Sequence, residues 1–360
     1  MMRLLKGIHW PTVTVMLIIS GVSFFAIYSA TYREYGHYFI YRQLMWLGVA
    51  FVLFWITVAI GYRSLLNVSY MIYSFSLLLL VFVLAFGVIR QGAQRWIAIG
   101  SFVLQPSEFC RLATMFVLAQ FLAERARRLG QKRSFAMGAF LVMIPFILIL
   151  KQPDLGSALL FIPILLAMLF VWGVRIRYLI GVFFMGLASL PFAWFSLKTY
   201  QQKRLLVFLN PNADPLGSGY TALQSKIAVG SGGLLGKGWL HGTQTQLQFV
   251  PEHHTDFIFC VIGEEFGFAG CAFLILLFCL MVGYALHIMD RTTDQRARIL
   301  AAGIAAMIFF QVMINIGMTI GLAPITGITL PLVSYGGSSL IATYMALGIL
   351  VSIHKERSIF

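Results

Sequence analysis

Long runs of apolar residues recur along the chain, separated by short polar stretches. Each run is about 20 residues long, the length at which an α-helix spans the hydrocarbon core of a bilayer. The predicted fold class is therefore an all-α polytopic membrane protein, with residues 1–360 forming a single transmembrane domain. The pattern predicts ten membrane helices, over residues 11–31, 38–61, 65–88, 107–124, 135–151, 154–174, 178–197, 256–287, 298–321 and 334–353.

Composition agrees with this pattern. The chain is 60% hydrophobic and 11% charged, whereas a soluble domain has about 25% charged residues. The first apolar run follows Arg3 and Lys6, is long for a signal-peptide core and lacks a clear small-residue cleavage site. We therefore expect it to be retained as a helix. Pro145, Pro163 and Pro191 fall inside apolar runs and predict kinks.

The net charge of +14 reflects membrane topology. If the N-terminus is cytoplasmic, more than half of the 26 Lys and Arg residues fall in short loops on the inner side, as the positive-inside rule requires. We therefore predict cytoplasmic N- and C-termini and no nucleic-acid partner. The basic stretch 124–134 is expected to face anionic lipid. The four cysteines lie in apolar runs and are expected to be small buried hydrophobes.

Three acids stand at the outer ends of predicted helices, in the stretches QPSEF (Glu108), QPDLG (Asp154) and HTDFIF (Asp256). Taken singly, each has an ordinary structural explanation. Acids near a helix start cap backbone N–H groups or complement the helix dipole, and Arg111 can pair with Glu108 three residues earlier.

Taken together, these acids predict a functional crater. Ionisable groups at membrane depth are costly and usually face a cavity or pathway. With Arg111 and Lys151 they would form a polar crater open to the outside, suited to a phosphorylated, membrane-borne substrate. Glu264 and Glu265 lie deeper, about 12–14 Å into their helix. At least one is expected to line an internal polar pocket, unless it simply pairs with Arg42.

The only long non-membrane stretch is 198–255, on the outer side. Its apolar content predicts order, and KIAVGSGGLLGKGWL predicts an amphipathic piece at the membrane interface. GSGGLLGKG lacks the spacing and the Ser or Thr of a phosphate-binding loop. His253 and His254 are adjacent and poorly placed to share one metal ion. Gln311 and Asn315 are explained by interhelical hydrogen bonds.

Several stretches resemble one family in order and spacing over about residues 10–355. They are QRWIAIGSFVLQPSE, QPDLGSA, PEHHTDFIF followed by GEEFG, and NIGMTIGLAPITGITLPLVSYGGSS. These stretches are similar to the motifs of the SEDS proteins (shape, elongation, division and sporulation). GSGGLLGKGWLHGTQTQLQFVPEHHTDF resembles the elongation branch more than the division branch.

The resemblance implies a peptidoglycan glycosyltransferase that polymerises lipid II in the bacterial cytoplasmic membrane. It implies a class B penicillin-binding protein and other rod-shape complex membrane proteins as partners. The family's essential acid falls on Asp256, the expected general base, with Glu108 and Arg111 also expected in catalysis. Arg111 stands where the family often has Lys. The residues expected to contact substrate are Asp154, Lys151, Trp96, Glu252, His254, Lys226 and Ser334.

The expected leaving group is undecaprenyl pyrophosphate, with Arg111 and Lys151 facing its charge. Asp256, Glu108 and Asp154 are the candidates for holding a divalent cation, Mg²⁺ or Mn²⁺, and no organic cofactor is expected. Two other functions stay open at this point. One is a lipid II flippase, although the sequence shows no inverted repeat. The other is a scaffold without chemistry.

Overall fold

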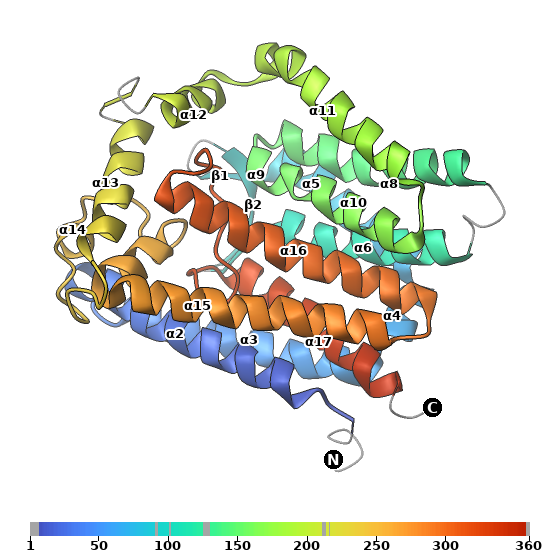
Figure 1. The fold of residues 1–360 in the computed structure, drawn as a ribbon, viewed down its shortest axis with the longest axis horizontal. Helices are drawn as coiled ribbons and strands as arrows, with labels where there is room; N and C mark the ends of the chain where they lie inside the picture. Colours follow the sequence, from blue (N-terminus) through green and yellow to red (C-terminus); the bar gives the residue numbers. More distant parts are fainter. Residues whose placement is uncertain are drawn as a thin grey trace.

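The computed structural model describes residues 7–90, 93–100, 102–124, 130–210, 214–215 and 217–357. Most of these residues lie in long helices that run side by side in one bundle (Figure 1). In chain order the elements are α2 (Trp10–Tyr35), α3 (Tyr38–Ile60), α4 (Tyr62–Asn67), α5 (Ser69–Phe86), β1 (Val88–Arg90), β2 (Ala93–Ile99), β3 (Phe102–Leu104), α6 (Pro106–Glu124), α8 (Gln131–Lys151), α9 (Leu155–Leu159), α10 (Phe161–Trp172), α11 (Ile176–Ser196), α12 (Thr199–Leu209), α13 (Ser218–Ser231), α14 (Thr243–Gln246), α15 (Ile258–Arg291), α16 (Gln295–Ile320) and α17 (Gly337–Arg357).

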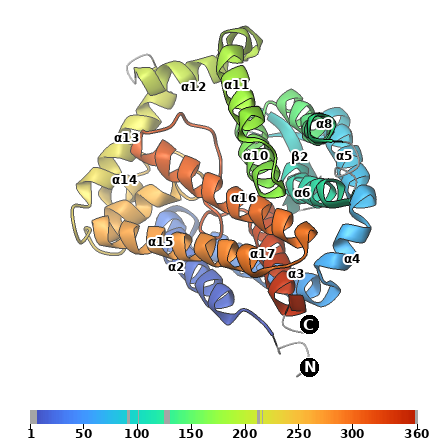
Figure 2. The ribbon, with the colours of Figure 1, turned by 45° about the vertical axis from the view of Figure 1, so that its right-hand side comes forward.

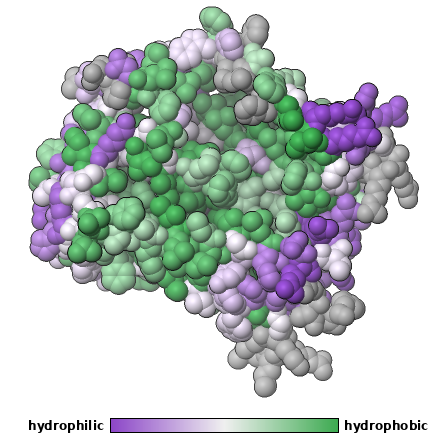
Figure 3. Space-filling model, viewed as in Figure 1, coloured by the Kyte–Doolittle hydropathy of each residue, from purple (hydrophilic) through white to green (hydrophobic). Residues whose placement is uncertain are grey.

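Eight segments among the described residues are long and apolar enough to cross a membrane. They correspond to eight of the ten predicted runs, and α6 and α11 correspond to the other two. One face of the molecule shows a broad apolar band between hydrophilic ends (Figure 3). The start of α2 and the end of α17 lie near the same end of the bundle (Figure 1), in keeping with termini on one side. The chain is a multi-pass membrane protein.

The centre of the bundle is formed by α6, α16 and α17. Nearly every residue of α6 is buried, and α16 and α17 are the most buried of the candidate spans. Helix α17 packs on α3, whereas α16 packs on α15, α10 and α6. By contrast, only 28% of the apolar span in each of α3, α5 and α8 is buried inside the protein, as expected for helices that face lipid.

A small sheet interrupts the helices and was not predicted. The expected helix over 65–88 is instead α4 and α5, and the chain then forms three antiparallel strands in the order β1-β2-β3. Val88 pairs with Trp96, and Ile97 pairs with Leu104. Gly100, with φ of 61°, turns the chain between β2 and β3. Strands of three to seven residues have too few positions for their alternation to stand out beside 20-residue apolar runs.

The long outer segment contains α12, α13 and α14, at the end of the molecule away from the termini (Figures 1 and 2). The predicted amphipathic piece is divided: its first residues belong to α13 and the rest form a loop, 232–242. Helix α13 buries Ser225 and Ala228. The Ser225 hydroxyl donates to the backbone oxygen of Thr319 at 2.5 Å, which ties α13 to the end of α16.

This loop is inserted into helix α15. In an unbroken helix the N–H groups of Phe268 and Ala269 would bond to the carbonyls four residues earlier. Here Phe268 N donates to Gly233 O at 2.9 Å, and Ala269 N donates to Leu234 O at 3.0 Å. The backbone of α15 is non-helical at Gly267, with φ of 63° and ψ of −160°, which only glycine adopts without strain.

The carbonyls freed by this break are satisfied by the same loop. Lys237 N donates to Glu264 O, and Gly238 N donates to Glu265 O, each at 3.0 Å. A Cβ atom at Gly236 would lie 2.1 Å from Glu265 O, so a side chain there is excluded. The glycines of GSGGLLGKG therefore permit close backbone approach and replace helix hydrogen bonds that a membrane segment cannot leave unmade.

The Glu264 side chain fastens the inserted loop. It is fully buried and accepts hydrogen bonds from Lys237 Nζ at 2.8 Å, Gln244 N at 2.8 Å and Thr245 N at 3.0 Å. Glu265 is also buried and accepts a hydrogen bond from the Ser29 hydroxyl. Neither acid lines a cavity described below. The suggested ion pair with Arg42 is therefore not formed by Glu264, which pairs with Lys237 instead.

We predict that Glu264→Gln destabilises the protein by about 2 kcal/mol. This is below the roughly 3–5 kcal/mol for breaking a fully buried pair, because the Lys237 side chain is 27% exposed. A thermal melt in detergent, with limited proteolysis of 232–242, measures the effect. Glu124→Gln is the control, since it removes a half-exposed pair with Arg296 and should change little. Equal melting of both variants would contradict the fastening role.

Candidate functional site

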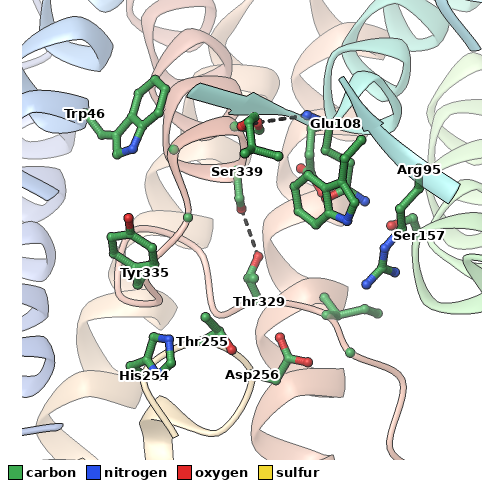
Figure 4. A pocket seen from close by; sticks show the side chains of 18 of the residues that line it. Trp46, Arg95, Glu108, Ser157, His254, Thr255, Asp256, Thr329, Tyr335 and Ser339 are labelled. Carbon is green, nitrogen blue, oxygen red and sulfur yellow. Dashed lines mark hydrogen bonds between the residues drawn. The ribbon is translucent and has the colours of Figure 1, made fainter. Parts of the chain in front are cut away.

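A cavity of about 440 Å³ lies among α3, β2, α6, the turn before α15 and the segment before α17 (Figure 4). Its wall combines aromatic side chains with polar and charged ones. The aromatic lining residues are Tyr38, Phe39, Trp46, Trp96 and Tyr335. The polar and charged ones include Arg42, Arg95, Gln105, Glu108, His254, Thr255, Asp256 and Ser339.

A second cavity of about 100 Å³ adjoins the first. Both are lined by Arg95, Asp256 and Gly327, so they meet at these three residues. Asp154 and Arg204 line the smaller cavity. In Figure 4 the carboxylate of Asp256 and the guanidinium of Arg95 point into the same space.

Asp256 is not a helix cap. Helix α15 begins at Ile258, two residues later than predicted, with no acid in its first turn and no side-chain cap. The Asp256 carboxylate makes no hydrogen bond or ion pair with the described residues. Gly327 borders it closely: a Cβ there would lie 3.3 Å from Asp256 Oδ2, and the φ of 74° also favours glycine.

The backbone of this turn is held from the opposite side at three consecutive carbonyls. Tyr335 N donates to His254 O at 3.0 Å. The Ser334 hydroxyl donates to the next carbonyl, that of Thr255, at 2.6 Å. Asn315 Nδ2 donates to the Asp256 carbonyl at 2.8 Å. Asn315 and Ser334 thus act on the position of the acid, and Ser334, expected to bind substrate, lines neither cavity.

Burial dominates the electrostatics at Asp256. Protein surrounds the carboxylate although the cavities keep it partly accessible, and this desolvation raises its pKa to about 6. The charges of Arg95 and Arg204 oppose the increase, whereas those of Glu252 and Asp154 add to it. Burial also lowers the pKa of His254 below its usual range, so this ring is neutral at pH 7. An acid with a pKa near 6 is suited to accept a proton near neutral pH.

Asp154 is held by three groups and has a structural role. Its side chain caps α9 by accepting from Ser157 N at 3.2 Å. It also accepts from Gln105 Nε2 at 2.8 Å and pairs with Arg95 at 3.2 Å. The residue is 2% exposed. Asp154 therefore orients Arg95 at the junction of the two cavities.

Glu108 and Arg111 form an ion pair one helical turn apart on α6. Glu108 lines the larger cavity, whereas Arg111 is 1% exposed, is buried among the packed helices and lines neither cavity. The ion pair that the sequence spacing suggested is therefore confirmed. Arg111 acts on the cavity through Glu108, not by facing it.

Comparison with known proteins identifies the family. The family model FtsW/RodA/SpoVE, described as cell cycle protein, matches residues 4–359. The chain belongs to the FtsW/RodA/SpoVE family. It is 40% identical to peptidoglycan glycosyltransferase MrdB of Escherichia coli (strain K12), over 96% of this chain and 94% of that protein. It is 37% identical to stage V sporulation protein E of Bacillus subtilis (strain 168), over 95% of each chain.

Solved structures agree with this assignment. A chain from a structure titled "Structural coordination of polymerization and crosslinking by a peptidoglycan synthase complex" superposes with a TM-score of 0.84, at 35% identity over 97% of this chain and 98% of that one. Rod shape determining protein RodA of Thermus thermophilus gives a TM-score of 0.75, at 30% identity over 98% of each chain. The family that the sequence motifs resemble is confirmed.

Within this FtsW/RodA/SpoVE protein, four predicted site residues line the larger cavity: Asp256, Glu108, Trp96 and His254. Asp154 lines the smaller one. Other predicted residues lie elsewhere. Lys151 is exposed at the end of α8, and Lys226 is exposed and lies over Gly321. Glu252 is exposed beside Thr255. The predicted crater was expected to contain Arg111 and Lys151, but neither of these cations lines a cavity.

The cations that face the cavities were missed. They are Arg42 and Arg95 in the larger cavity, and Arg95 and Arg204 in the smaller one. Arg95 directly precedes Trp96 in the motif QRWIAIG, so its motif was available as a signal. No local pattern distinguishes Arg42 or Arg204 from other basic residues near a helix end.

The three candidate carboxylates do not fit a shared cation site. Asp154 is occupied by Arg95 and Gln105, and Glu108 by Arg111. Across the described ranges, no three His, Cys, Asp or Glu side chains are grouped for a metal ion. A hard cation prefers several converging oxygen ligands. The positive charge facing the cavities comes instead from arginine.

Proposed function

We propose that this chain is a peptidoglycan glycosyltransferase that polymerises lipid II in the bacterial cytoplasmic membrane. The observation that carries the proposal is an unpaired, largely desolvated Asp256 at the junction of two cavities. Glycosyl transfer requires two substrates to meet at one base. Relatives along nearly the whole chain, MrdB among them, are named peptidoglycan glycosyltransferases, which supports the same activity.

The two cavities differ in a way that suits the parts of such substrates. Rings such as Trp46, Trp96 and Tyr335 give the larger cavity apolar faces for sugar, with polar groups between them for hydroxyls. Arg95 and Arg204 give the smaller cavity positive charge for pyrophosphate. Guanidinium groups bind phosphate oxygens through paired hydrogen bonds.

The proposed step is a single displacement. The Asp256 carboxylate accepts the proton of the acceptor sugar 4-hydroxyl as that oxygen attacks C1 of the growing strand. The new C1–O bond forms while the bond from C1 to pyrophosphate breaks, and undecaprenyl pyrophosphate leaves with the electron pair. Attack opposite the leaving group inverts the anomeric carbon. The charge that develops on pyrophosphate is stabilised by Arg95 and Arg204.

Other expected components follow this assignment. The neighbouring structure whose title joins polymerisation and crosslinking supports a crosslinking partner, and we assign that part to a class B penicillin-binding protein. Other rod-shape complex membrane proteins are expected beside it. Arginines supply positive charge in both cavities.

Reconstitution tests the proposal directly. Purified protein in liposomes, supplied with lipid II, should produce long glycan strands on a gel. A lipid II flippase would move the lipid between leaflets without lengthening glycan, and a scaffold would do neither. Relocation without polymer would therefore overturn the proposed function.

We predict that polymerisation falls as pH is lowered through about 6, because a general base must be deprotonated and the pKa of Asp256 is raised to about 6. Initial rates measured from about pH 5 to about pH 8 locate this fall, which is the acid limb of the pH–rate profile. His254→Gln should retain it, since the limb is assigned to the Asp256 carboxylate and not to the histidine ring. A limb that moves with His254→Gln would assign the titration to the histidine.

We predict unequal effects for two outer cations. Arg204→Gln should lower kcat/KM for lipid II about 10-fold or more, in line with removal of a charged hydrogen bond of about 1.5–3 kcal/mol. Lys151→Gln, a matched change at an exposed residue that lines neither cavity, should stay within about twofold. The reverse ranking would restore Lys151 as the pyrophosphate ligand and exclude Arg204.

A further inference from the structure

The larger cavity is too small for the product. Its volume of about 440 Å³ is in the range of sites for single small ligands. A polymer made there, as the proposed function requires, must extend beyond the wall. Among the described residues that line this cavity, Tyr38 alone is exposed, at 54%. Tyr38 therefore marks where the cavity opens to the surroundings.

Aromatic contacts continue from the cavity wall past this opening. Inside, the Phe39 ring contacts those of His254 and Tyr335, with centroid distances of 4.9 and 4.8 Å. The same Phe39 ring contacts Tyr38 at 5.4 Å and Tyr35 at 5.0 Å. Tyr35 does not line the cavity and is 47% exposed. One ring thus joins the cavity wall to an exposed aromatic surface.

Hydrogen-bonding groups stand beside these exposed rings. Glu34 accepts a hydrogen bond from Gln248, which brings the end of α2 against the turn before α15. Glu252, in that turn, accepts from the Thr255 hydroxyl at 3.1 Å. Glu34 precedes Tyr35 in the chain, and the charges of Glu34 and Glu252 both reach the Tyr35 hydroxyl. Aromatic faces with adjacent carboxylate acceptors suit a chain of sugars, whose rings have apolar faces and hydroxyl edges.

We propose that the rim formed by Tyr35, Tyr38, Glu34, Gln248 and Glu252 binds the glycan strand as it leaves the cavity. The proposal rests on the proposed function and adds a product-binding site to it. Tyr and Trp at a membrane interface also anchor helices. The rim differs from such anchors because its rings contact the cavity wall and stand beside acids.

The test is the length of the product. Rim contacts hold the strand between additions, so losing one ring increases release relative to addition. Tyr35→Ala should shorten strands about fivefold, the factor for about 1 kcal/mol of aromatic contact, at an unchanged initial rate of lipid II consumption. Tyr35→Phe should keep the length. Tyr35→Leu retains apolar bulk against Phe39 and should shorten strands, which guards against a folding defect in the alanine variant.

Tyr41→Ala is the matched control, since Tyr41 is a 66% exposed tyrosine three residues after Tyr38 on α3 and lines neither cavity. Its strands should be of wild-type length. Wild-type length from Tyr35→Leu, or equal shortening by Tyr41→Ala, would overturn the rim and leave membrane anchoring as the role of these rings. Absence of polymer from the wild-type protein would overturn the proposed function itself, and the rim with it.

Discussion

The site depends on three hydrogen bonds, from Asn315, Ser334 and Tyr335, to the consecutive backbone carbonyls of residues 254–256. Together these three bonds are called the backbone grip. A buried carboxylate without a partner is costly, and an unrestrained turn would move the acid towards solvent or a nearby arginine. The grip acts on backbone, so it leaves the Asp256 side chain free for chemistry. Gly327 completes the arrangement, because it leaves room beside the carboxylate. Position is fixed by the main chain, and reactivity by the desolvated side chain.

The inserted loop 232–242 also acts through backbone hydrogen bonds, in this case to helix α15. Helix α15 breaks at Gly267, yet its freed N–H and carbonyl groups are paired by the loop. Glu264 then accepts hydrogen bonds from Lys237 of the loop and from two backbone amides of α14. The outer helices are thus tied to the helix that directly follows Asp256. Arginines at the cavity junction complete the site, with Arg95 held in place by Asp154.

Much of this organisation could be predicted from the sequence, because bilayer thickness imposes a length on every apolar run. Asp256, Glu108 and Trp96 were found because motifs surround them. The sheet was missed because its strands are short, and the start of α15 was predicted two residues too early because Asp256 resembles a first-turn acid. Arg204 and Arg42 converge on the cavities only through tertiary packing. Lys151 was misplaced because nearness in sequence to Asp154 does not fix a side chain's direction.

The central claim is that Asp256 is the catalytic base, and Asp256→Asn tests it most directly. Asn is nearly isosteric, and the backbone grip does not involve the side chain, so the melting temperature should stay within a few degrees. Loss of a general base lowers rate by about 10²–10⁴. The measurement is glycan length from lipid II on a gel beside a thermal melt of the same purified sample. An unchanged melt with no polymer is the predicted result. An unchanged melt with wild-type polymer would contradict the account.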